Sequence, residues 1–136
     1  MKRTFLFIIV AALVMIAVTV AIYMLIIFPK IKEQIEVRKM NIREIELSRV
    51  KDGAFHGEFT YGNFTYAVEV VVQDHNIQRI SILNNRGDSD YAKKAEGVTG
   101  RVIKAQSLKV DVVTGATTTS KALLKAIENA LAAGFE

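Results

Sequence analysis

The side chains of this chain that could do chemistry gather in one stretch, Asp111-Val-Val-Thr-Gly-Ala-Thr-Thr-Thr-Ser120. It combines a glycine with five hydroxyl side chains, and apolar residues at helical spacing follow from Lys121 to Phe135. The pattern predicts a hydroxyl cluster at a helix N-terminus, where free N–H groups and a partial positive charge favour a phosphate. Gly115 would let the backbone approach that phosphate closely. Serine and threonine are also common N-caps, so the cluster could simply cap the helix.

The composition leaves room for one small folded domain and an anchor. The 136 residues carry a formal net charge of +4, and the basic residues are spread along the chain, so we expect no nucleic-acid partner. The absence of cysteine excludes disulfides, thiolate chemistry and Cys-ligated metals. His56 and His75 have no second ligand at metal spacing, and we interpret both as surface residues.

The N-terminal part of the chain predicts a membrane anchor. No charged residue occurs from Phe5 to Phe28, a run longer than the roughly 20 residues that a helix needs to cross a bilayer. A cleaved signal peptide is the alternative, but the run is long for one and no small-residue cleavage site follows it. We therefore predict a single-pass anchor helix in the cell membrane over 1–29, ended by Pro29, and an amphipathic spacer over 30–49.

Charge counting does not orient this anchor convincingly. Lys2 and Arg3 precede the apolar run, and a larger number of basic residues follows it, which by the positive-inside rule would place the domain in the cytoplasm. The downstream basic residues alternate with glutamates and belong partly to a folded segment. We therefore give this count little weight.

Residues 50–136 predict a small α+β domain, an antiparallel β-meander packed by two helices. Strands are expected over 54–61, 65–73 and 77–83, with tight turns between them. A helix capped by Ser89 or Asp90 should follow, weakened or broken by glycines, and the last helix comes after the hydroxyl cluster. The polar loop before Ser89 could line a ligand site or serve only as a connection.

Several segments together carry a family resemblance. Val50–Gly57, Tyr66–Val72, Ile77–Leu83, Ala105–Leu108 and Asp111–Ser120 occur in the order found in the FMN-binding domain family, which the chain resembles from about Val50 to Leu131. That family includes the flavin-carrying subunits of the sodium-pumping NADH:quinone reductase and of the related ferredoxin:NAD oxidoreductase. The chain lacks the extra segments of those larger subunits and looks more like a stand-alone anchored flavoprotein.

The resemblance implies a covalent cofactor. In the family a flavin transferase takes FMN from FAD and joins its phosphate to a threonine, in a motif Asp-x-x-Ser/Thr-Gly-Ala-Thr. The motif maps onto Asp111 as the element that the transferase recognises, and onto Thr117 as the threonine that carries FMN. The other cofactor-binding candidates are the neighbouring motif residues and two asparagines expected at the flavin ring or ribityl chain: Thr114, Gly115, Ala116, Thr118, Thr119, Ser120, Asn84 and Asn85.

The resemblance also implies a function. The family's flavinylated domains face the extracytoplasmic side, so we expect an electron-transfer module there, an electron carrier rather than a self-contained enzyme. Its expected partners are the flavin transferase, redox partner proteins or a quinone-linked dehydrogenase, and the membrane. Two alternatives stay open: a reductase or sensor that binds FMN without a covalent bond, and an anchored interaction domain without a cofactor.

Overall fold

The N-terminal unit of the protein is a helix. The computed structural model describes residues 1–85, 87 and 89–135, and it divides into two compact units, Met1–Ile35 and Glu36–Glu136. The first unit contains α1 (Lys2–Ile22), a π-helical turn (Tyr23–Ile27) and the start of α2 (Phe28–Lys39). Within the described residues, one helix is long and apolar enough to cross a membrane, and its most apolar window has a mean hydropathy of 3.1.

Pro29 does not interrupt this helix, although we expected the span to end there. The wider turn Tyr23–Ile27 precedes it, and α2 continues through the proline to Lys39. Proline lacks an N–H, and its ring crowds the carbonyl four residues earlier, here that of Leu25. Leu25 lies within the π-helical turn, and a local widening of this kind is a common way to accommodate such crowding.

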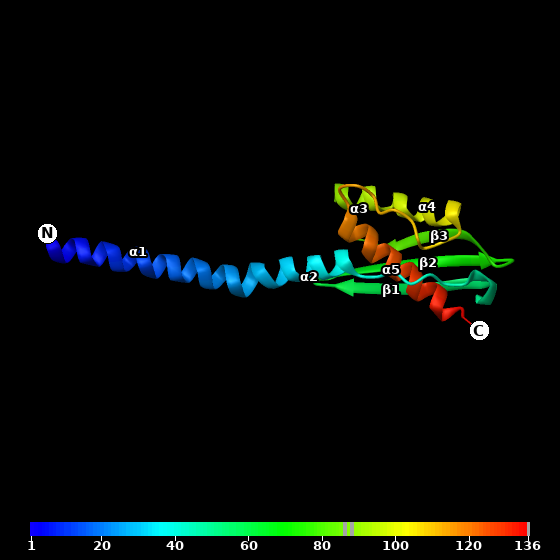
Figure 1. Cartoon of the computed structure of the whole chain (residues 1–136), viewed down its shortest axis with the longest axis horizontal. Coiled ribbons are helices and arrows are strands. Elements are labelled where there is room, and N and C mark those ends of the chain that lie inside the picture. The colour runs from blue at the N-terminus through cyan, green and yellow to red at the C-terminus, as the bar shows by residue number, and fades with distance from the viewer. Residues whose placement is uncertain (86, 88, 136) are drawn as a thin grey trace. The chain divides into compact units, whose positions relative to one another are not determined.

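The second unit is built on a three-stranded antiparallel sheet in the order β1-β2-β3 (Figure 1). The strands are β1 (Gly53–Tyr61), β2 (Phe64–Gln73) and β3 (Asn76–Asn84), within one residue of the predicted ranges. Alternate β2 side chains form the centre of the core and are at most 1% exposed: Tyr66, Val68, Val70 and Val72. The α+β meander predicted from the sequence is confirmed.

Two-residue turns connect these strands. The first, Gly62–Asn63, is as predicted, and the second is one residue shorter than predicted because β3 begins at Asn76 and not at Ile77. Gly62 has a φ of +56° in the first turn, the conformation that glycine adopts without strain. In the second turn Asp74 and His75 have φ angles of 50° and 58°, both in the left-handed region that a type I′ hairpin requires. Both turns therefore follow the right-handed twist of the strands that they join.

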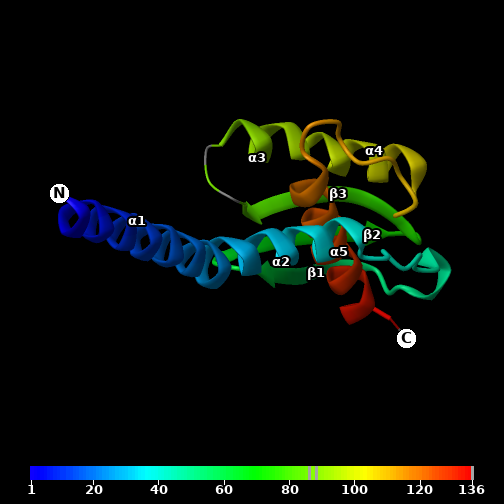
Figure 2. The same ribbon diagram turned by 60° about the vertical axis from the view of Figure 1, so that its left-hand side comes forward.

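Three helices cover one face of the sheet: α3 (Asp90–Ala95), α4 (Gly97–Ala105) and α5 (Thr117–Ala133). Figures 1 and 2 show α5 crossing the sheet and α3 and α4 beside β3. The Ser89 hydroxyl caps α3 by accepting a hydrogen bond from the Ala92 N–H at 3.2 Å, as predicted. The predicted weak point in the helix is also present, because α3 ends before Glu96 and α4 begins at Gly97.

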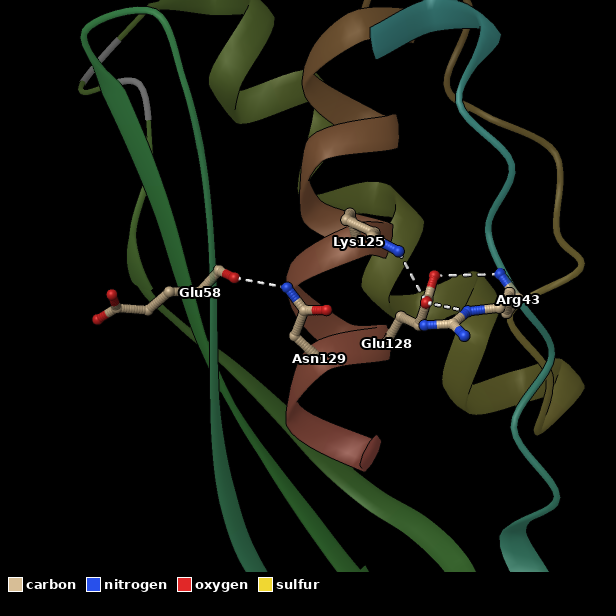
Figure 3. Close-up of polar contacts among 5 residues, drawn as sticks. All are labelled: Arg43, Glu58, Lys125, Glu128 and Asn129. Atoms are coloured by element: carbon tan, nitrogen blue, oxygen red, sulfur yellow. Dashed lines mark hydrogen bonds and ion pairs between the residues drawn. The ribbon is translucent and has the colours of Figure 1, made fainter. Parts of the chain in front are cut away.

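The close approach of α5 to β1 depends on Gly57. A Cβ atom at this position would overlap the Ala126 carbonyl oxygen and the Ala130 amide nitrogen, and it would lie 2.7 Å from Ala130 Cβ. Every other residue type would therefore push the helix away from the strand. Asn129 supports the same contact by donating a hydrogen bond to the Glu58 carbonyl at 2.7 Å (Figure 3).

Residues 36–49, which we expected to form the second part of a spacer, pack along the other side of α5. Glu128, 1% exposed, accepts hydrogen bonds from the Arg43 N–H and guanidinium at 3.0 Å each and from Lys125 at 2.7 Å (Figure 3). Burial raises the pKa of Glu128, but the contacts with Lys125 and Arg43 outweigh it, and the net pKa is lowered. The buried carboxylate therefore fixes this segment to the helix that carries the hydroxyl cluster at its start.

Candidate functional site

The hydroxyl cluster begins with a tight turn. The Ala116 N–H donates to the Val113 carbonyl at 2.9 Å, and Gly115 has a φ of +81°. This closes a β-turn of type II with glycine at the position that needs a positive φ. Apart from its two chain neighbours, no described residue has a heavy atom within 4 Å of where a Gly115 Cβ would be, so the outer side of the turn is open. A ligand therefore has access to the backbone here.

Helix α5 starts directly after this turn with an uncapped end. It begins at Thr117, earlier than expected, and its N-cap residue Ala116 provides no side-chain hydrogen bond. The first helical backbone bond runs from the Ser120 N–H to the Ala116 carbonyl at 2.9 Å. The N–H groups of residues 117–119 precede that bond and point out of the helix end. The alternative in which the hydroxyls cap this helix is therefore not what the structure shows.

Most of the hydroxyl side chains are committed to the fold. Ser120 is fully buried and accepts a hydrogen bond from the Val113 N–H at 3.2 Å, which holds the turn against the helix. Thr118 is 9% exposed and accepts from Arg38, and Thr119 is 3% exposed. Thr114 is exposed on the turn.

Thr117 differs from its neighbours. It is the first residue of α5, it is half-buried, and its hydroxyl forms no hydrogen bond with any residue that the structure describes. It lies directly beside the open N–H groups of the helix end. Thr119 likewise forms no hydrogen bond with the described residues, but it is only 3% exposed, so Thr117 is the more accessible of the two.

Two basic side chains that the sequence analysis did not single out lie at this helix end. Arg38 Nε donates to Thr118 Oγ1 at 2.9 Å, and Lys121 Nζ donates to the Met40 carbonyl at 3.1 Å. Arg38 is 80 positions from Thr118 in the sequence, so no local pattern could have connected the two. Both contacts attach residues 36–40 to the first turns of α5.

Asp111, the expected recognition element, is exposed. Its backbone is held by Arg101 of α4, whose Nη1 donates to the Asp111 carbonyl at 2.7 Å and to the Val112 carbonyl at 3.0 Å. Arg101 was also missed, because its contacts are with carbonyl groups that no side-chain motif reveals. The aspartate side chain is thus presented to solvent from a fixed backbone.

Asn84 and Asn85 lie in a separate hollow. A surface depression of about 430 Å³ is lined by both asparagines together with residues of β3 and α4: Ile80, Ile82, Leu83, Glu96 and Thr99. Thr114 and Thr117 do not line it. The first turn of α4 borders both the hollow, through Glu96 and Thr99, and the hydroxyl turn, since a Cβ on Gly97 would lie 3.7 Å from Val113 Cγ2. The structure therefore brings the asparagines near the motif but not into contact with Thr117.

These residues fit a phosphate ester. The helix end provides N–H donors and the positive end of a dipole, Gly115 leaves room, Thr117 provides a hydroxyl, and two cations are close by. This donor set suits an anion with several oxygen acceptors, such as a phosphate.

Comparison with known proteins is consistent with this geometry. The family model described as FMN-binding domain matches residues 61–132, more than half of the chain. The chain belongs to the FMN-binding domain family. The match includes β2, β3 and the hydroxyl cluster, and it indicates FMN as the cofactor.

One curated relative is similar over much of the chain. It is an uncharacterized protein of Treponema pallidum (strain Nichols), 32% identical over 90 residues that cover 65% of this chain. The aligned part spans only 25% of that protein's length. The resemblance therefore concerns one part of a longer protein.

Proposed function

We propose that this protein carries FMN covalently on Thr117 and acts as a membrane-anchored electron-transfer module on the extracytoplasmic face. The observation that carries the proposal is the state of Thr117, a hydroxyl without a hydrogen-bond partner among the described residues, set at the open N-terminus of α5 within a complete family motif. Family membership and the apolar helix support the coarser part of the proposal, an FMN-binding protein with an N-terminal anchor.

Attachment requires a balanced transfer from FAD. The Thr117 oxygen forms a bond to the FMN phosphorus, the bond from that phosphorus to the AMP part of FAD breaks, and AMP leaves. The hydroxyl proton passes to the flavin transferase. The product is a phosphodiester with one negative charge, which the N-terminal end of α5 stabilises by roughly 0.3–1 kcal/mol.

The residues around Thr117 have distinct roles in this proposal. Gly115 keeps the turn narrow where the phosphate approaches, and the N–H groups at the start of α5 hold its oxygens. Arg101 fixes the backbone of Asp111, so that the transferase finds the carboxylate in a constant position. Asn84 and Asn85 contact the flavin ring or ribityl chain from the hollow beside α4.

The bound flavin supplies the redox chemistry, and the protein supplies attachment, orientation and a membrane location. The partners are a flavin transferase, which modifies Thr117, and redox proteins or a quinone-linked dehydrogenase, which exchange electrons with the flavin. The anchor keeps the domain at the membrane surface, where such a dehydrogenase would be reached.

The test is the intact mass of the full-length chain purified in detergent after coexpression with a flavin transferase. We expect the mass of the chain plus one FMN minus one water, and flavin absorbance that bleaches with dithionite. Thr117→Ala should abolish the mass increase. Thr60→Ala, which removes an exposed hydroxyl outside the motif, should retain it.

Three other results would each change the conclusion. The bare mass together with bound, dissociable flavin indicates a non-covalent FMN protein. The bare mass without colour indicates an interaction domain without a cofactor. Retention of the added mass in Thr117→Ala places the ester on another residue, and peptide mapping of residues 111–121 identifies it.

A further inference from the structure

The charges around the start of α5 oppose the helix dipole. The first turn of the helix contains no acidic residue, yet Arg38 and Lys121 both lie at this end. Cations are unfavourable near a helix N-terminus, which already carries about half a positive charge. In the protein without its cofactor, this end therefore has a surplus of positive charge that a bound anion would neutralise.

Arg38 is the better placed of the two cations. Its Nε is fixed by Thr118 Oγ1 at 2.9 Å, and Thr118 follows Thr117 directly in the chain. Its two terminal nitrogens form no hydrogen bond or ion pair with the described residues, and the residue is exposed. A guanidinium held at Nε presents the remaining N–H groups as a planar fork, a shape that matches the oxygens of a phosphate.

Lys121 has a different task. It lies four residues after Thr117, on the same side of α5, but its ammonium already donates to the Met40 carbonyl at 3.1 Å. That contact holds the backbone that follows α2 against α5. Lys121 therefore fixes the segment that carries Arg38, and it adds positive charge without the fork geometry.

We propose that Arg38 is a positioning residue that binds the phosphate of FMN at Thr117, both during transfer and in the finished diester. The inference rests on the proposed function, since it assigns a further contact to the same phosphate. It also makes the end of α2 part of the cofactor site. Attachment of FMN would then fasten residues 36–40 more firmly to α5.

The test compares the full-length chain with three variants in detergent: Arg38→Gln, Arg38→Lys and the control Lys39→Gln. Lys39 is an exposed neighbour whose side chain forms no hydrogen bond or ion pair with the described residues, and its substitution changes the net charge by the same amount as Arg38→Gln. Two quantities are measured: the initial rate of flavinylation with limiting transferase, followed by intact mass, and the rise in Tm that complete flavinylation produces.

We expect Arg38→Gln to slow flavinylation about three- to tenfold, the size of one partly exposed charge-assisted contact. Arg38→Lys should recover part of the rate, and Lys39→Gln should behave like the unaltered chain. The rise in Tm on flavinylation should be smaller in Arg38→Gln. If Arg38 only stabilised the packing of residues 36–40 against α5, the substitution would lower the Tm of the flavin-free and flavinylated forms equally.

Equal rates and equal rises in Tm for Arg38→Gln and the unaltered chain would overturn the proposal. A slower rate with an unchanged rise in Tm would also overturn it, because Arg38 would then be recognised by the transferase and not by the phosphate. Failure of the unaltered chain to gain FMN at all refutes the proposed function instead. Circular dichroism of each variant before modification shows whether it is folded. If Arg38→Gln does not fold, Arg38→Lys is used in its place to test the proposal.

Discussion

The position of α5 over the sheet should be unusually sensitive to one methyl group, added by Gly57→Ala. The new Cβ would meet backbone atoms of Ala126 and Ala130 and would lie 2.7 Å from Ala130 Cβ. Carbon atoms pack at about 3.5–4.0 Å, so α5 would have to retreat by about 1 Å. Both residues are fully buried, and a retreat opens the contact between helix and sheet along the centre of the core.

The cost of this change can be bounded. Overpacking typically destabilises by about 1–3 kcal/mol, and the upper end applies because the obstructing atoms belong to the backbone and cannot rotate away. With a urea m-value of about 1–3 kcal/mol/M, a loss of about 3 kcal/mol lowers the unfolding midpoint by about 1–3 M. Unfolding of the full-length chain in non-ionic detergent, followed by circular dichroism, measures this shift.

Gly100→Ala is the matched control. Gly100 lies within α4, and a Cβ there would meet no atom within 4 Å from the rest of the described chain beyond its own helical turn. The same substitution should therefore stabilise the protein by roughly 0.5–1 kcal/mol, because alanine is the better helix former. A Gly57→Ala variant with an unchanged midpoint would refute the close approach of α5 and β1, and with it the placement of Thr117.

Three further substitutions test the site and its support. Ser120→Ala removes the acceptor of the Val113 N–H and should destabilise the protein by about 1–2 kcal/mol in the same urea assay, whereas Ser120→Thr, if tolerated, retains the acceptor. Gly115→Ala forces a non-glycine residue to a φ of +81° and should cost about 1 kcal/mol, with open space around the new methyl; a larger loss would mean that the turn is more crowded than the structure shows. Since the pKa of Glu128 is lowered in the folded state, its ionised form adds stability above the ordinary value of 4.5, and that stability is lost as the pH falls through the lowered pKa. Glu128→Gln should therefore be less stable at pH 7 and should show a weaker decline between pH 5 and pH 3; parallel pH profiles of the two proteins would contradict this.

Local patterns in the sequence were enough to predict the elements of the fold. The turn at Gly62, the Ser89 cap and the break before Gly97 each depend on the conformational preference of one or two residues. The length and composition of the apolar N-terminal run were likewise enough to predict a helix that could cross a membrane. Such features do not depend on contacts with distant residues, and they can therefore be predicted from the local sequence.

The family motif was also readable from the sequence, but its geometry was not. Asp111 and Thr117 could be named as motif positions. The open helix end, and a Thr117 hydroxyl without a hydrogen bond to the described residues, appear only in the folded structure. Ser120 shows the difference most clearly. It looks like one more hydroxyl in a row, yet it is buried and holds the Val113 N–H.

Only the tertiary structure brought distant residues together. Arg38 meets Thr118 across 80 positions, Arg43 meets Glu128 across 85, and Gly57 lies under Ala126 and Ala130. These contacts depend on how α5, β1 and residues 36–49 pack against one another, and no periodicity within any single segment encodes them. The sequence by itself determined which element carries the motif threonine, Thr117. Packing decided which charges surround it, because electrostatic contacts depend on distance in space and not along the chain.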